Sequence, residues 1–212
     1  MKKSKLIIFI FFILLNNSIF YKLESKINNI IVVKVGNNII TSLDVQNEIL
    51  TNLVINNIEI NQENINKNKN FSVKNLINKS LKELEINKYD INEYNKQDLQ
   101  NYINSIAKNL NMDSKNLKEI FVQNNIDYSK FIENYKIELL WNTLIYKIYQ
   151  NQTNINIVDV NNEVEKIKGS KSEEELKKIK ETILGQRKQK KLNLFSRSHL
   201  SNLENTTVVE FK

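Results

Sequence analysis

From residue 30 onward, the pattern of apolar and polar residues predicts a short β-type segment, a turn and an amphipathic helix. Apart from Lys34, residues 30–35 are β-branched and apolar, and Gly36 with the asparagines after it supplies turn chemistry before a second short extended piece. Thr41 then caps a helix that runs to about residue 55, and Asp44 is the acidic partner of a capping box. We expect a strand, a tight turn and a capped helix here.

The next segment is polar and rich in asparagine. Residues 56–70 have low complexity and no apolar periodicity, which predicts a long surface loop. Ser72 is expected to cap the helix that follows. The apolar stripe of this helix consists of Val73, Leu76, Ile77, Leu81, Leu84 and Ile91.

Three further helices are predicted in the middle of the chain. One follows Asn95, one begins near Asp113, and the longest spans Asp127 to about Gln150. Asn125 stands at a helix end, where a left-handed residue is favoured and Asn is tolerated better than most. Because the longest helix is apolar on more than one side, we expect it to lie centrally among its neighbours.

The carboxy-terminal part resumes helical periodicity after a break. Residues 155–157 predict a brief extended piece and residues 159–168 a short helix, after which Gly169 interrupts the pattern. Ser172 and Glu175 form a second capping box that opens a charged helix.

The chain ends in a β-type segment, residues 206–211. Isolated strands leave backbone groups unpaired, so we expect Ile31–Val35 to pair with Val208–Phe211 and close the domain end to end. The predicted fold class is mainly α, a multi-helix core domain with a small β-pairing of the amino-terminal and carboxy-terminal strands.

The amino terminus resembles an export signal. Lys2, Lys3 and Lys5 precede an unbroken apolar run, Leu6 to Leu15, which is shorter than the roughly 20 residues of a membrane span. We therefore expect residues 1–25 to act as a signal peptide. Cleavage and retention as a tether both stay open.

The net charge of +7 does not predict a nucleic-acid surface. The first 25 residues carry +3 of it, and elsewhere both signs are interspersed except at residues 187–191. Recognition of nucleic acid needs a basic stripe combined with stacking or base-reading groups. We expect no nucleic-acid partner.

The residues for common catalytic chemistry are scarce. The chain has no Cys, one His and three Gly, which excludes disulfides, thiol nucleophiles and glycine-rich phosphate loops. His199 lies at helical spacing with apolar residues, which favours a surface or half-core role over catalysis. Residues 173–175 are acidic in the first turn of a helix, where they favour the helix dipole. We expect no enzyme, cofactor or metal site.

Two stretches resemble the amino-terminal domain of SurA-type periplasmic chaperones. The first, residues 31–45, reads IVVKVGNNIITSLDV, and the second begins with Ile106–Met112. The second continues through Leu117, Asn125–Tyr128, Phe131, Ile137 and Glu138.

The resemblance implies a domain order. Residues 26–168 would form the SurA-like helical domain, residues 169–174 a linker, and residues 175–212 the helices and strand that return to the core. Family members carry one or two parvulin-type prolyl isomerase domains, with a Gly-Gly-Asp-Leu-Gly-like motif, where this chain has only Gly169-Ser-Lys-Ser172.

The function that follows is an ATP-independent holdase in the periplasm, without prolyl isomerase activity. Its partners would be unfolded outer-membrane proteins or aromatic-rich peptides, with transient membrane contact, and the protein would be a monomer or weak dimer. Such a role needs an apolar cleft with a polar rim. The aromatic residues proposed to contact clients are Tyr102, Phe121, Tyr128, Tyr135, Trp141, Tyr146 and Tyr149.

Two other functions compete with this one. The protein could be a membrane-tethered structural or assembly protein, with residues 6–21 kept as the anchor and a fixed partner on the helical domain. It could also be an unusual prolyl isomerase, although the glycine and histidine counts conflict with that reading. Aromatic residues at helical spacing also serve as ordinary core, so each candidate contact has a purely structural alternative.

Overall fold

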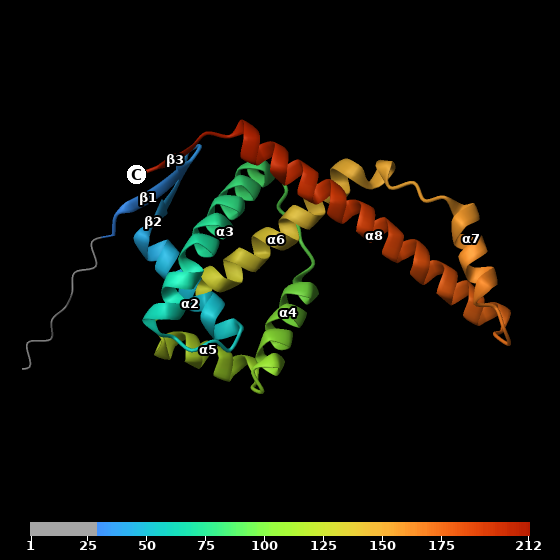
Figure 1. Ribbon diagram of the computed structural model, residues 1–212, viewed down its shortest axis with the longest axis horizontal. Coiled ribbons are helices and arrows are strands. Elements are labelled where there is room, and N and C mark those ends of the chain that lie inside the picture. Colours follow the sequence, from blue (N-terminus) through green and yellow to red (C-terminus); the bar gives the residue numbers. More distant parts are fainter. Residues whose placement is uncertain (1–28) are drawn as a thin grey trace, which may run out of the picture.

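The chain folds into a helical body, closed by a small sheet, and a helical arm that stands off it (Figure 1). The computed structural model describes residues 29–212, so the predicted signal peptide lies outside the described residues. The mainly helical fold class is confirmed. The elements are β1 (Ile31–Val35), β2 (Asn38–Thr41), α2 (Ser42–Ile55), α3 (Gln62–Lys88), α4 (Lys96–Asn109), α5 (Ser114–Gln123), α6 (Tyr128–Tyr149), a 3-10 turn (Gln150–Gln152), α7 (Ile157–Lys166), α8 (Glu173–Thr206) and β3 (Val209–Phe211).

The sheet joins the two ends of the described chain. Its strand order is β2-β1-β3, and both pairings are antiparallel. Val33 lies opposite Phe211 and Val35 lies opposite Val209, which confirms the predicted closure of the domain by its terminal strands. Val33 and Val35 are fully buried, because alternate residues of a strand point to the same face.

The hairpin between β1 and β2 depends on Gly36. Its φ of 54° lies in the left-handed region, at the first of the two turn residues, where hairpins favour glycine. A Cβ at this position would also come within 3.2 Å of the Leu84 side chain. Glycine therefore sets the turn and lets the hairpin approach α3.

The capping box at the start of α2 is confirmed. The Thr41 hydroxyl accepts a hydrogen bond from the Asp44 backbone N–H, and the Asp44 carboxylate accepts one from the Thr41 backbone N–H. Asp44 also binds the Lys130 ammonium at the start of α6. Asp44 therefore stabilises the start of α2 and also holds the start of α6 beside it.

The loop predicted over residues 56–70 is wrong for most of its length. α3 begins at Gln62, and the Asn61 side chain caps it by accepting from the Asn64 backbone N–H. Ser72 is no cap, because it lies fully buried inside α3. A continuing helix has no nucleation cost, so the apolar second half of α3 extends readily into the polar first half.

Asparagine and aspartate replace glycine at helix ends. Asn57, Asp90, Asn111 and Asn125 follow four successive helices, α2 to α5, and all have φ between 51° and 56°. After α5, the Ile126 N–H donates to the Phe121 carbonyl across the left-handed Asn125. The prediction at Asn125 is confirmed. Because the chain has only three glycines, Asn or Asp takes the left-handed position at each of these four helix ends.

α6 is the central helix, as its apolar faces predicted. It packs against α3, α4, α5 and α8. Trp141 and Leu144 are fully buried there, and the Trp141 indole N–H donates to the Ser196 hydroxyl of α8 at 2.8 Å. α6 therefore links the body to the long carboxy-terminal helix.

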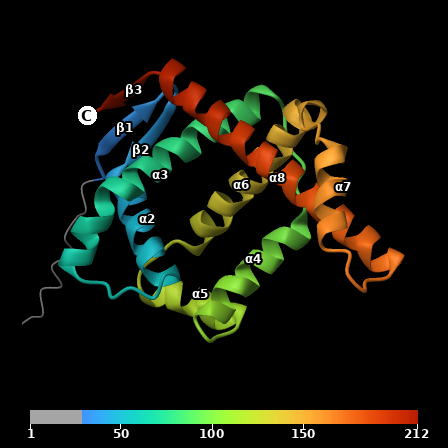
Figure 2. The same ribbon diagram turned by 45° about the vertical axis from the view of Figure 1, so that its right-hand side comes forward.

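The arm consists of α7 and the amino-terminal half of α8, residues 157–190. Figures 1 and 2 both show α7 lying against α8, and Val160 and Val164 are buried there. The Arg187 guanidinium binds Glu163 across this interface. The expected extended piece at residues 155–157 is wrong, because Ile157 already begins α7.

The second capping box is confirmed at the start of α8, where Ser172 and Glu175 exchange hydrogen bonds. α8 then continues unbroken for 34 residues and returns to the body. Within residues 29–212, none of the helices is long and apolar enough to cross a membrane.

Candidate functional site

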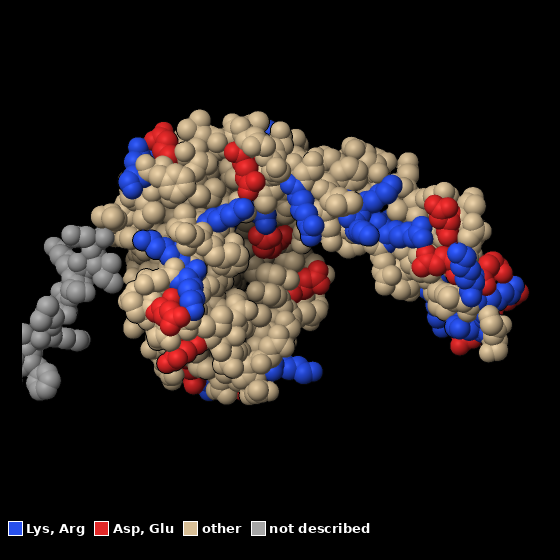
Figure 3. Space-filling model, viewed as in Figure 1, with Lys and Arg blue, Asp and Glu red and all other residues tan. Residues whose placement is uncertain are grey.

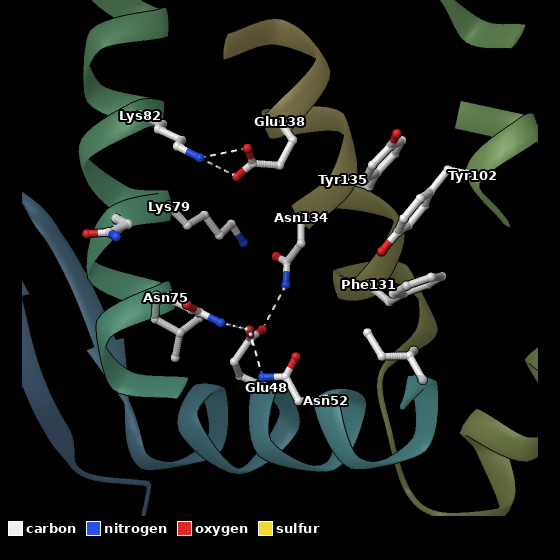
Figure 4. Close-up of a pocket in the computed structure, with 13 residues that line it drawn as sticks. Glu48, Asn52, Asn75, Lys79, Lys82, Tyr102, Phe131, Asn134, Tyr135 and Glu138 are labelled. Carbon is white, nitrogen blue, oxygen red and sulfur yellow. Dashed lines mark hydrogen bonds and ion pairs between the residues drawn. The ribbon is translucent and has the colours of Figure 1, made fainter. Parts of the chain in front are cut away.

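A polar cavity of about 320 Å³ lies in the body between α2, α3, α4 and α6 (Figure 4). Each of these four helices contributes part of its wall. Its lining residues are Glu48, Asn52, Ile55, Asn75, Leu76, Asn78, Lys79, Lys82, Tyr102, Phe131, Asn134, Tyr135 and Glu138.

Glu48 lies at the floor of this cavity and is buried. One carboxylate oxygen, Oε1, accepts hydrogen bonds from the side-chain amides of Asn52 (3.3 Å) and Asn75 (3.4 Å). The other, Oε2, accepts one from the Asn134 amide at 3.1 Å. Burial raises the pKa of Glu48 above its ordinary value, and the amide donors and the nearby Lys79 charge offset this in part. The carboxylate is thus fully engaged by three helices, including its own.

The two lysines of the cavity differ in their partners. The Lys82 ammonium binds both oxygens of Glu138 at 2.6 Å and joins α3 to α6. The Lys79 ammonium points into the cavity (Figure 4), and it makes no ion pair or hydrogen bond with any residue in the described range 29–212. Lys79 is therefore the cation available to a bound group.

Two amide oxygens of the wall also lack partners. Oδ1 of Asn134 and Oδ1 of Asn78 are buried, and neither accepts a hydrogen bond from the residues that the structure describes. Because Asn134 donates its Nδ2 to Glu48, its orientation is fixed and its oxygen is the free atom. A buried acceptor without a donor is costly, so each such atom calls for an explanation.

Aromatic rings form the remaining wall. Tyr102 of α4 and Tyr135 of α6 stack face to face, and Phe131 lies with its ring centroid 6.0 Å from that of Tyr102. Burial raises the pKa of both tyrosines, so their phenols stay protonated. The cavity therefore combines a flat aromatic wall with unpaired polar groups.

The seven aromatic residues predicted to contact clients fall in different environments. Tyr102 and Tyr135 line the cavity, but Phe121 and Trp141 are fully buried core residues. Tyr128 is half-buried and packs edge-on against Phe121. The structure thus brings only two of these five residues together at one accessible site.

The last two predicted residues lie near the end of α6. Tyr146 is 56% exposed. Tyr149 is half-buried, stacks on Phe195 of α8 and shares a 2.8 Å hydrogen bond with Nδ1 of His199. Tyr149 therefore serves the contact between α6 and α8, and Tyr146 is free to meet another molecule.

His199 has the half-core position that its spacing predicted. Its side chain is 13% exposed and lies between Tyr149 of α6 and Glu85 of α3, with Nε2 3.2 Å from the Glu85 carboxylate. The ring also packs edge-on against Trp141. These contacts hold α8 on the body, which gives the histidine a structural role.

The polar residues of the cavity were not predicted from the sequence. Glu48 offered one signal, because it lies between Val45 and Ile49 on the buried side of α2, where a carboxylate is unusual. The asparagines offered none, since the whole chain is rich in Asn.

A second hollow on the body is apolar. It measures about 570 Å³ and lies between β1, α2 and the first half of α3. Apolar side chains dominate its wall, and two lysines are its charged residues. The lining residues are Ile30, Ile31, Val32, Ser42, Val45, Gln46, Ile49, Leu50, Gln62, Ile65, Asn66, Lys69, Val73 and Lys212.

Neither hollow has the composition of a metal centre. Among residues 29–212, no group of three or more His, Asp or Glu side chains is placed to hold a metal ion. Comparison with known proteins adds no relative: no protein-family model matches the chain, and no curated protein matches it.

Proposed function

We propose that this protein is an exported, ATP-independent chaperone that binds unfolded outer-membrane proteins and has no prolyl isomerase activity. The observation that carries the proposal is the outline of the molecule, which is hollowed between body and arm (Figure 3). A concave surface with apolar residues is what an unfolded chain needs in order to bind without a fixed sequence.

Exposed apolar residues on the arm also support client binding. Ile157, Val158 and Ile167 are 48%, 63% and 41% exposed, although α7 already buries two valines against α8. On the body, Tyr146 and the apolar groove near β1 add further surface of the same kind. The charges of the arm are mixed in sign (Figure 3), which keeps such a surface soluble.

The path of the chain supports the SurA-type reading. The resemblance expects a final helix and strand that return to the core, and α8 with β3 make this return against α3, α6 and β1. Residues 167–172 connect α7 to α8. Family members have their isomerase domains in this part of the chain, so binding would be the function that remains.

Export rests on residues 1–25, which lie outside the described part. Mass spectrometry of the mature amino terminus in a membrane and a soluble fraction tests it. Cleavage supports a periplasmic chaperone. Retention of residues 6–21, with one stoichiometric partner and no general client binding, would support the tethered assembly protein instead.

Suppression of aggregation tests the chaperone directly. An outer-membrane β-barrel protein is diluted from urea, and light scattering is followed without nucleotide. We expect the wild type to suppress scattering and the arm variant Ile157→Glu/Val158→Glu to suppress it less. The matched control, Asn161→Glu/Asn162→Glu, adds the same charge to exposed positions of the same helix and should behave as the wild type.

A prolyl isomerisation assay on the same protein separates the enzyme from the holdase. We expect no acceleration at concentrations that suppress aggregation. Isomerase activity in the pure protein would overturn the non-enzymatic part of the proposal.

A further inference from the structure

The apolar groove of about 570 Å³ lies where the first half of α3 passes β1 and the start of α2 (Figures 1 and 2). α3 contributes one stripe of residues to it, spaced three or four apart: Gln62, Ile65, Asn66, Lys69 and Val73. Ile65 and Val73 are only partly buried, whereas the leucines further along the same helix belong to the core. The groove stays open because the first half of α3 is too polar to fill it.

The other walls of the groove are aliphatic. α2 contributes the buried residues Val45 and Ile49, and the start of β1 contributes Ile30 and Ile31, which are 60% and 45% exposed. Among the described residues that line the groove, none is aromatic. Aliphatic surface that is accessible to water favours burial against an apolar ligand.

The charges of the groove favour an anion. Of the described lining residues none is Asp or Glu, and the Lys212 ammonium already binds Glu210 at 2.8 Å. The Lys69 ammonium has no ion pair or hydrogen bond with any residue from 29 to 212. Its side chain is exposed and lies four residues from both Ile65 and Val73, so its aliphatic stem can cover the apolar wall while the charge stays free.

The polar neutral residues of α3 do not compete for this role. The Gln62 side-chain amide donates to Oδ1 of Asn66 at 2.9 Å, so these two residues partner each other. A polypeptide segment would bring several backbone N–H and C=O groups that need partners, which aliphatic walls do not supply. An acyl chain with one anionic group has a single polar end, and the groove has a single unpaired cation.

The volume of the groove suits such a ligand. About 570 Å³ lies within the roughly 300–1,000 Å³ of pockets that hold small ligands. It is also several times the roughly 150 Å³ of an apolar cavity that holds benzene. A single medium-length acyl chain therefore fits.

We propose that the apolar groove binds one acyl chain of an anionic amphiphile. The chain packs against Ile31, Ile49 and Ile65, and its carboxylate lies at the Lys69 ammonium. This site is separate from the proposed chaperone function, since it recognises a lipid-type carboxylate and not an unfolded protein.

The first test titrates sodium decanoate into the full chain, with isoleucine methyl groups followed by NMR. We expect saturable shifts of Ile31, Ile49 and Ile65, and none of Ile39, which lies on β2 outside the groove. Decanol has the same chain length without the charge and should bind about tenfold more weakly. No saturable shift with decanoate would overturn the proposal. Shifts with the neutral peptide acetyl-Leu-Val-Leu-amide and none with decanoate would assign the groove to a polypeptide and overturn it as well.

Substitution of Lys69 tests the carboxylate contact. Lys69→Met should weaken decanoate binding about tenfold, because hydrogen bonds to charged groups are strong, and should leave decanol binding unchanged. The unchanged decanol affinity shows that the groove is still folded. Lys69→Arg should recover most of the decanoate affinity. Lys74→Met removes an exposed lysine outside the groove on the same helix and should have no effect. Equal decanoate affinity in Lys69→Met and wild type would overturn the role of Lys69.

A carboxylate placed in the groove tests the apolar wall. Ile31→Glu should weaken decanoate binding at least tenfold through like-charge repulsion and loss of apolar contact. Ile39→Glu makes the same change at an exposed position outside the groove and should bind decanoate as the wild type does. Wild-type affinity in Ile31→Glu would show that the acyl chain does not lie in this groove.

The acyl site and the chaperone function can fail separately. If decanoate binds as expected and the wild type does not suppress client aggregation, the acyl site stands and the chaperone function fails. If the wild type suppresses aggregation and no isoleucine of the groove responds to decanoate, the chaperone function stands and the acyl site fails.

Discussion

The rings of Tyr102 and Tyr135 stack with their centroids 3.5 Å apart and their planes 5° from parallel. Tyr102 belongs to α4 and Tyr135 to α6, so the stack fastens α4 to the central helix. The same rings face the cavity that also contains Glu48 and Lys79 (Figure 4). One aromatic contact therefore supports the body and forms part of the candidate binding surface.

A double-mutant cycle should detect this stack. We expect Tyr102→Ala and Tyr135→Ala each to lower the free energy of unfolding, and the double variant to lose about 1 kcal/mol less than the sum, as measured for aromatic pairs. Urea denaturation gives the four values. Strictly additive losses would mean that the two rings do not stabilise each other.

Burial of Glu48 should make stability depend on pH in one direction. The raised pKa means that the folded protein binds the Glu48 proton more tightly than the unfolded chain does. The stabilisation is complete below about pH 4.3, the unfolded value. It is lost as the pH rises through the pKa in the folded protein.

Glu48→Gln should remove this component. The free energy of unfolding is measured in urea from pH 4 to 8 for both proteins. The stability of the wild type relative to Glu48→Gln should fall as the pH rises through the pKa of Glu48 in the folded protein, and then level off. Glu59→Gln, at an exposed position beyond α2, is the matched control and should give a flat difference. Two parallel pH profiles for wild type and Glu48→Gln would contradict the raised pKa.

His199 should stabilise the contact between α8 and the body. His199→Ala removes the hydrogen-bond partner of Tyr149 and one of the two partners of the buried Glu85, so we expect a loss of about 2 kcal/mol in the free energy of unfolding. Arg197→Ala changes an exposed residue of the same helix and should cost less than about 0.5 kcal/mol. Similar small losses for both variants in urea would show that the histidine does not fasten α8.

The left-handed Asn125 should tolerate glycine but not alanine. Asn125→Ala places an ordinary side chain at φ 55° and should lower the free energy of unfolding by about 1 kcal/mol. Asn125→Gly should be neutral or slightly stabilising. Thermal unfolding compares the two, and a greater loss in the glycine variant would contradict the role of this residue at the helix end.

The sequence predicts those structural features whose residues lie close together in the chain. The capping box of Thr41 and Asp44 and the helix end at Asn125 involve residues a few positions apart, so their signals are local. The pairing of Val33 and Val35 with β3 was also predicted, because two lone β-type segments in a helical chain have few other partners.

Other features depend on contacts that the local pattern does not contain. The early start of α3 at Gln62 was missed, because asparagine-rich helices and loops look alike in a chain of this composition. Tyr102 and Trp141 each lie on the apolar stripe of their own helix. Tyr102 nevertheless lines the cavity, whereas Trp141 is a core residue. Only the packing of α2, α3, α4 and α6 around one space distinguishes them.

Binding of an unfolded client without nucleotide tests the central claim most directly. An outer-membrane β-barrel protein carrying a fluorescent label is prepared unfolded at low urea and, separately, folded in detergent micelles, and each form is titrated with the mature chain. We predict a saturable rise in anisotropy for the unfolded form and none for the folded form. No binding to the unfolded form, or equal binding to both forms, would contradict the account.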